Sequence, residues 1–191
     1  MELEFKPVVA GDIDRLRPFY GLRPNKTCDS VFLDSFLWKD YYHVQCAVSE
    51  GRAVLWLMEK DGQVSTAMPL CREEDLPYFF QQMVDYFSGV LHKPFYISLA
   101  DEEAVQCLNL DPALFEVEEQ VDLKDYLYSG EELRKLEGKK FVKKRNHLNG
   151  FKRTYEGRYE YRRLCCSDRH EVWQFMERWR QHKEEVGAME L

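Results

Sequence analysis

Apolar and polar positions change their spacing along the chain, and the changes predict a mixture of strands and helices. Val44, Cys46 and Val48 alternate with polar residues, which is the two-residue period of a half-buried strand. Ser49-Glu50-Gly51 and Asp61-Gly62 are turn signals between three strand-like runs. We therefore predict an antiparallel meander from about residue 42 to residue 70.

Four further segments have strand-like composition, at residues 5–9, 95–100, 114–128 and 159–165. In the third of these segments, the side chains expected to face inward are Phe115, Val117, Val121 and Leu123.

Helical spacing is clearest at residues 73–93, where apolar side chains recur at steps of three and four. Further helices are expected at residues 12–21, 28–42, 101–110, 129–138 and 139–155, and from residue 168 almost to residue 191. Ser129-x-x-Glu132 and Asp168-x-x-Glu171 match the capping-box pattern that begins a helix. The predicted fold class is therefore mixed α+β, with a largely antiparallel sheet flanked by helices.

The last predicted helix carries one apolar stripe, which consists of Val172, Phe175, Met176, Trp179 and Val186. This stripe needs a surface to pack on. Either the rest of the same domain supplies it, or the natural protein continues past Leu191. We expect the second, because a new strand and helix begin near the end of the chain.

Composition supports a folded protein without a membrane span. The 191 residues are 45% apolar and 14% aromatic, enough for a core, which argues against intrinsic disorder. The longest apolar run, residues 53–58, is far below the roughly 18 residues of a membrane span. The sequence MELEF begins the chain with acidic residues where a signal peptide carries basic ones, so a cytoplasmic location is expected.

Charge is unevenly distributed along the chain, which has a net charge of −7. Residues 1–130 hold 11 basic and 23 acidic side chains, whereas residues 131–191 hold 16 basic and 11 acidic ones. Such asymmetry suggests an anionic partner for the basic part.

The basic residues are densest from Lys139 to Arg153, where seven of fifteen residues are Lys or Arg and none is acidic. As a helix up to about Tyr155, this stretch has a narrow apolar stripe of Phe141, Leu148, Phe151 and Tyr155, and we expect both phenylalanines to lie in the core. One interpretation is an ordinary solvated helix face. We favour an anion site, because solvated faces usually mix both signs of charge. Phosphate suits Lys and Arg best. The candidate phosphate-binding residues are Lys139, Lys140, Lys143, Lys144, Arg145, Asn146, His147, Asn149 and Arg153.

The run L-x-G-K-K-x-x-x-K-R-N-H-x-N-x-F-x-R-x-Y, from Leu136 to Tyr155, resembles the C-terminal domain family of bacterial phosphatidylglycerol lysyltransferases. Residues 30–51, with Trp38, resemble the N-terminal part of the same family. The resemblance implies two tandem GNAT-like acyltransferase domains. Residues 1–156 would be the first domain, including the basic helix, and residues 157–191 the beginning of a second.

Family members of known role move an aminoacyl group from charged tRNA to an acceptor such as a lipid, and they resemble the Fem peptidyltransferases in fold. The resemblance therefore implies an aminoacyl- or acyltransferase whose basic residues contact phosphates of tRNA, a nucleotide or a lipid head group. Aminoacyl-tRNA or acyl-CoA would be the donor. The chain has no Q/R-x-x-G-x-G/A loop of the type that binds acetyl-CoA, so the sequence itself gives no support for acyl-CoA.

Motifs of ordinary catalysis are absent from the sequence, including G-x-S-x-G, the P-loop and H-E-x-x-H, and no cofactor is evident. The six cysteines form no CxxC and have no zinc-finger spacing, so we expect reduced, mostly buried thiols and no metal site. The main alternative to a transferase is a phosphate- or nucleic-acid-binding module without chemistry. A peripheral membrane protein is a weaker third hypothesis, and no catalytic residue can be assigned.

Overall fold

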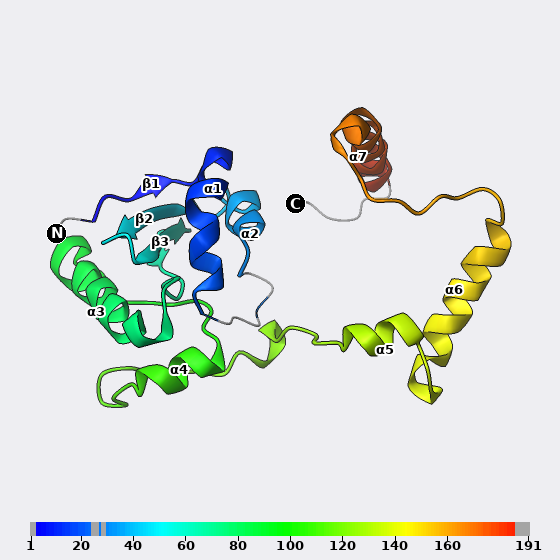
Figure 1. Cartoon of the computed structure of the whole chain (residues 1–191). Helices are drawn as coiled ribbons and strands as arrows, with labels where there is room; N and C mark the ends of the chain where they lie inside the picture. The colour runs from blue at the N-terminus through cyan, green and yellow to red at the C-terminus, as the bar shows by residue number, and fades with distance from the viewer. Residues whose placement is uncertain (1–2, 24–26, 28–29, 186–191) are drawn as a thin grey trace. The chain divides into compact units, whose positions relative to one another are not determined.

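A four-stranded antiparallel sheet forms the centre of the N-terminal part of the protein. The computed structural model describes residues 3–23, 27 and 30–185. The strands are β1 (Lys6–Pro7), β2 (Gln45–Ser49), β3 (Ala53–Lys60) and β4 (Gln63–Ser65), in that spatial order. Every neighbouring pair is antiparallel, with Cys46 opposite Trp56 in the central pair. The α+β class and the predicted meander are thus confirmed (Figure 1).

The two hairpin turns lie where the sequence predicted them. Glu50 and Gly51 join β2 to β3 with φ values of 53° and 66°, and Asp61 and Gly62 join β3 to β4 with 52° and 79°. Two consecutive positive φ angles are typical of the type I′ turn, whose twist matches that of the flanking strands. Glycine takes the second position because it adopts positive φ without a steric penalty.

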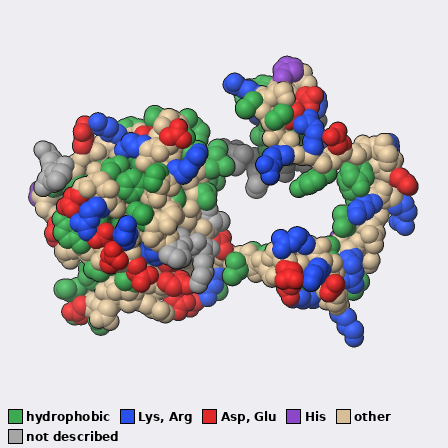
Figure 2. Space-filling model, viewed as in Figure 1, with side chains coloured by type: hydrophobic (Ala, Val, Ile, Leu, Met, Phe, Trp, Pro, Cys, Tyr) green, Lys and Arg blue, Asp and Glu red, His purple; other side chains and the backbone are tan. Residues whose placement is uncertain are grey.

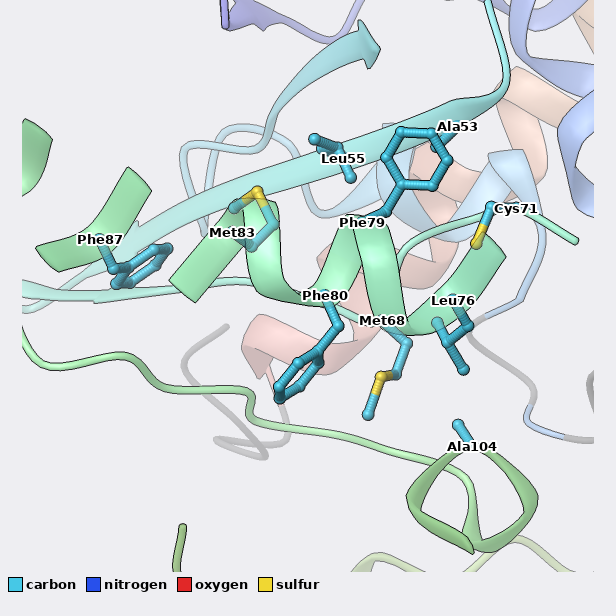
Figure 3. Close-up of a cluster of buried hydrophobic side chains, with 10 residues drawn as sticks. All are labelled: Ala53, Leu55, Met68, Cys71, Leu76, Phe79, Phe80, Met83, Phe87 and Ala104. Carbon is cyan, nitrogen blue, oxygen red and sulfur yellow. The ribbon is translucent and has the colours of Figure 1, made fainter. Parts of the chain in front are cut away.

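One face of the sheet packs against α3 (Leu76–Tyr86), which follows the single turn η3 (Glu73–Asp75) and continues as η4 (Phe87–Leu91). Leu76, Phe79, Met83 and Phe87 have at most 1% of their surface exposed. Figure 3 shows Phe79 and Met83 towards Ala53 and Leu55 of β3, and Leu76, Phe87, Met68, Cys71, Phe80 and Ala104 belong to the same cluster. The three- and four-residue spacing of the sequence therefore identified this helix and its buried face.

The other face of the sheet is covered by the short helical segments that precede β2. These are η1 (Ala10–Asp12), α1 (Ile13–Leu16), η2 (Arg17–Gly21) and α2 (Phe32–Leu37). Leu16 and Phe32 pack there against Cys46, Val54 and Trp56. Successive residues of β3 thus face two separate cores, and its first four residues are all buried. Helices on both faces of the sheet are consistent with the GNAT-like arrangement expected from the resemblance.

The chain divides into two compact units, residues 1–126 and 127–191. The first ends with α4 (Glu102–Leu108) and the turn η5 (Val121–Leu123). The second contains α5 (Gly130–Lys135), η6 (Lys139–Phe141), α6 (Val142–Thr154), η7 (Cys166–Asp168) and α7 (Arg169–Glu185). The expected transferase domains, residues 1–156 and 157–191, stay a prediction.

Three predicted strands do not form. In residues 95–100 only Ile97 makes an isolated bridge, to Thr66, and residues 114–128 and 159–165 have no strand ladder. Phe115 does pack against Phe80, at 5.5 Å between ring centroids. However, the other inward positions, Val117, Val121 and Leu123, are more than half exposed. Alternating polarity indicates strand propensity, but a strand also needs a partner for its backbone groups.

The expected helix over residues 28–42 is shorter than predicted. Among the described residues it comprises Phe32–Leu37, and Trp38 follows as its C-cap. The turn that follows is closed by the bond from the Tyr42 amide to the Trp38 carbonyl, and His43 has a positive φ of 45°. Residues 28–29 and Val186 of the last predicted helix lie outside the described residues.

Asp168 also differs from its predicted role as the cap of α7. Its carboxylate accepts the amide of Cys165, at 2.8 Å, and two bonds from Arg162, at 2.7 and 2.8 Å. The Arg162 bonds, followed by the Cys165 amide, hold the pKa of Asp168 well below its usual range. Asp168 therefore fixes the approach to α7, which begins at the next residue. By contrast, Ser129 does cap α5, because its hydroxyl accepts the Glu132 amide.

A buried ion pair joins two distant parts of the first unit. The Arg23 guanidinium donates to both carboxylate oxygens of Asp101, each at 3.0 Å, and both side chains are only 6% exposed. Asp101 also accepts the amide of Ala104 and so caps α4. Burial by itself raises the pKa of Asp101, but the bonds from Arg23 and Ala104 and the charge of Arg23 lower it overall.

We expect Asp101→Asn to destabilise the first unit by about 3–5 kcal/mol, because it leaves the Arg23 charge buried without a counter-charge while Asn still caps α4. Because the folded-state pKa of Asp101 is lowered, the native contribution is complete above the unfolded pKa, about 4, and is lost as pH falls through the folded pKa. Hydrogen exchange of the β3 amides measures this stability. Asp14→Asn, which removes an exposed pair with Arg17, is the control and should change nothing measurable. Equal stability of the Asp101→Asn and Asp14→Asn proteins at pH 7 would contradict the assignment.

Candidate phosphate-binding helix

The basic stretch folds as one helical segment, as predicted, in which the turn η6 leads directly into α6. The turn before it depends on Gly138, whose φ of 82° favours glycine. Phe141 anchors the segment and is only 5% exposed, which confirms its predicted core position. Phe151 is 46% exposed and lies against Tyr155 and Tyr159, at 4.9 and 5.0 Å between centroids, so its predicted core position is wrong.

Arg145 binds the backbone at the turn between α5 and α6. Its guanidinium donates to the carbonyl oxygens of Leu136 and Gly138, the second at 2.9 Å. Leu136 is the left-handed C-cap of α5, where carbonyl groups lack helical partners and the helix dipole favours a cation. Arg145 therefore satisfies the end of α5 and holds α6 at a defined angle to it.

Two of the predicted lysines are also in contact with other side chains. The Lys140 ammonium lies 2.7 Å from a carboxylate oxygen of Glu132 and 5.1 Å from the centroid of Phe141. The Lys144 ammonium lies 5.7 Å from the centroid of Tyr128. Lys144 is three residues after Phe141 and four before Leu148, so it lies on the apolar side of α6. The charge of Lys140 is thus partly offset within the protein.

The remaining candidates are exposed. Lys143, Asn146, His147 and Arg153, together with Gly150, follow one another at steps of three and four in α6, so they share one face, which we call the cationic face. Lys139 lies in the preceding turn and Asn149 at the side of this face. Within the described part of the chain, none of these side chains has a hydrogen-bond or ion-pair partner. Figure 2 shows basic side chains along α5 and α6.

The cationic face provides ionic and amide donors without a nearby acceptor. Lys and Arg bind phosphate through charge-assisted hydrogen bonds, and Asn can add neutral ones. The nearest acidic residues in sequence are Glu137 and Glu156, outside the helix at either end. The arrangement can therefore hold a phosphate group in water-exposed surroundings. Phosphate binding by the nine predicted residues stays a prediction.

Other chemistry finds less support in the side-chain geometry. Across residues 3–23, 27 and 30–185, no three His, Cys, Asp or Glu side chains come together in a way that could hold a metal ion. Of the described cysteines, Cys46 and Cys71 are buried, and burial raises the pKa of Cys71 to about 11. The other three described cysteines are exposed, so the prediction of mostly buried thiols is wrong. No described helix has both the length and the apolar composition needed to cross a bilayer.

Sequence reasoning missed the partners of Arg145 and Lys140, which separate these two residues from the exposed, unpaired basic residues. The bonds of Arg145 run seven and nine residues back along the chain, and the pair of Lys140 with Glu132 spans eight. These separations exceed the three- and four-residue rules for a single helix. The glycine at position 138, just after α5, was the one available signal that the chain turns back on itself.

Comparisons with known proteins agree with these observations. A family model described as "Phosphatidylglycerol lysyltransferase, C-terminal" matches residues 21–190. A crystal structure of a conserved protein of unknown function from Bacteroides thetaiotaomicron is similar in fold, with a TM-score of 0.82 and 24% sequence identity. The similarity covers 97% of this chain and 62% of that one, so the chain spans less than two thirds of this relative. A search of the curated proteins finds no significant match.

We expect Arg145→Ala to loosen the α5–α6 junction, because two bonds to backbone carbonyls are lost. The Leu136 amide, which donates to the Glu132 carbonyl, should exchange roughly tenfold faster in NMR measurements. Lys143→Ala removes a positive charge from the same helix without removing such a bond, and should leave this exchange rate unchanged. Unchanged exchange in Arg145→Ala, combined with a loss of polyanion binding, would contradict the structural role and make Arg145 a ligand-binding residue.

Proposed function

The chain belongs to the phosphatidylglycerol lysyltransferase C-terminal family, and on this premise we propose that it is part of an aminoacyltransferase whose helix α6 binds phosphates of the donor tRNA. The observation that supports the proposal most is the cationic face, where Lys143 and Arg153 are exposed and unpaired among the described residues. The chain spans 62% of the solved structure described above, so the transferase activity of the whole protein is part of what we propose.

The reaction would need little acid–base chemistry from side chains. In aminoacyl-tRNA the amino acid is linked to the ribose by an activated ester, so an acceptor hydroxyl can attack the carbonyl carbon of this ester directly. A new ester bond forms, the bond to the ribose oxygen breaks, and that oxygen takes up the proton which the acceptor loses. Positioning of the two reactants and stabilisation of the oxyanion can supply most of the acceleration. Binding the tRNA phosphates on α6 would contribute to positioning.

The chemistry of α6 favours the donor tRNA over the lipid acceptor as its ligand. A helix that binds a lipid surface inserts bulky apolar side chains beside its cations. On α6 the half-exposed Leu148 and Phe151 are not part of the row that joins Lys143 to Arg153. Val142, four residues before Asn146, borders the cationic face and is 42% exposed, but its side chain is small rather than bulky. A nucleic-acid backbone, in contrast, is bound through its phosphates by exposed cations and needs no inserted apolar side chain.

Charge reversal tests the binding step. The double variant Lys143→Glu, Arg153→Glu should weaken binding of fluorescein-labelled uncharged tRNA at least tenfold, because attraction on the cationic face becomes repulsion. Fluorescence anisotropy at about 0.1 M salt measures the affinity. Arg72→Glu combined with Lys93→Glu makes the same change of net charge on exposed residues of the first unit, and should retain binding. Equal losses in both double variants would mean that net charge alone, and not α6, attracts the tRNA.

Transfer of a labelled amino acid from charged tRNA to a lipid fraction tests the chemical step. We expect the whole protein to catalyse transfer and its Lys143→Glu, Arg153→Glu variant to lose it. Binding of tRNA without any transfer would instead favour the second candidate, a phosphate-binding module that has the same fold but no chemistry.

A further inference from the structure

Gly150 interrupts the side chains of the cationic face at its centre. It lies inside α6, more than one turn from either end of the helix. A glycine at such a position destabilises a helix by about 0.5–1 kcal/mol relative to alanine. Alanine at position 150 would therefore stabilise α6, unless something else requires that no side chain be present there.

Within the described residues of the second unit, neither backbone conformation nor packing calls for a glycine at position 150. Gly51, Gly62, Gly138 and Gly157 have positive φ, but Gly150 does not, so an L-residue fits its backbone conformation. A Cβ atom added to Gly150 would meet no heavy atom within 4 Å. Neither backbone strain nor close packing within the described protein thus excludes a larger residue.

The surroundings of Gly150 consist of hydrogen-bond donors. Asn146 and His147 lie four and three residues before it, and Arg153 and Thr154 lie three and four residues after it, so all four side chains border the same spot on the helix surface. None of them has a carboxylate partner among the described residues. The space above Gly150 is thus open, and side chains that can donate hydrogen bonds lie on both sides of it along the helix axis; we call this space the notch.

We propose that Gly150 is the point at which a phosphate group of the ligand comes closest to α6, with Asn146 and Arg153 donating to it from either side. This inference rests on the proposed function and assigns a contact position within it. Charge-assisted bonds to phosphate are short, about 2.7–2.9 Å, and they weaken steeply as the distance grows. A methyl group at position 150 would hold the phosphate away from the helix and lengthen these bonds.

The inference predicts that stability and binding change in opposite directions. Gly150→Ala should raise the thermal stability of the second unit, since alanine favours the helix, yet weaken the binding of a fluorescein-labelled RNA oligonucleotide about three- to tenfold. Gly150→Leu should weaken binding further, because its side chain fills the notch. If Gly150 affected only the stability of the helix, Gly150→Ala would bind the oligonucleotide as tightly as the native chain or more tightly.

Gly89→Ala is the matched control. Gly89 lies in the helical turn η4, its φ is not positive, and an added Cβ atom meets nothing within 4 Å there either. This variant should bind the oligonucleotide as the native chain does. Undiminished RNA binding by Gly150→Ala and Gly150→Leu, with binding still lost in Lys143→Glu, Arg153→Glu, overturns the role of Gly150 and leaves the proposed function intact. Failure of the native chain to bind RNA overturns both.

Discussion

The bonds from Arg145 to the Leu136 and Gly138 carbonyls are the interaction on which the presentation of the basic helix depends. Residues 127–191 bury few side chains: of the described ones, only Phe141 and Asp168 are less than 9% exposed. With so small a core, hydrophobic burial contributes little to the relative orientation of neighbouring helices in this unit. Local polar contacts must fix it instead. The guanidinium suits this role because it remains charged and bonds two acceptors at once.

The seven basic residues of 139–153 therefore have different roles: some bind groups within the protein, and others remain exposed. Arg145 is occupied by carbonyl oxygens, and Lys140 is opposed by Glu132. Lys143 and Arg153 are left on the exposed face without a carboxylate partner among the described residues. The like charges of Lys139 and Lys143, four residues apart, repel each other, and a bound phosphate would relieve the repulsion. The electrostatic case for a ligand thus comes from a few unpaired cations, and a simple count of the basic residues overstates it.

Local signals carried most of what the sequence could predict. The turn at Asp61-Gly62 and the buried face of α3 follow from neighbouring residues, and both formed as expected. Residues 114–128 show the limit of such reasoning, because alternation indicates strand propensity but says nothing about a backbone partner. The pair of Arg23 with Asp101 joins residues 78 positions apart and has no local signature. The family motif marked the basic helix correctly. Which of its basic residues bind within the protein and which remain exposed could be seen only from the geometry of the turn between α5 and α6.

The salt dependence of RNA binding tests the central claim most directly, because it counts the phosphates that are neutralised. On a single-stranded RNA, each phosphate contact contributes about −0.7 to the slope of log K against log salt concentration. If Lys139, Lys143 and Arg153 make the contacts, we expect a slope of about −2. A slope near zero would contradict phosphate binding by α6. A slope of about −5, as expected if all seven basic residues made contacts, would contradict the structural roles assigned to Arg145 and Lys140.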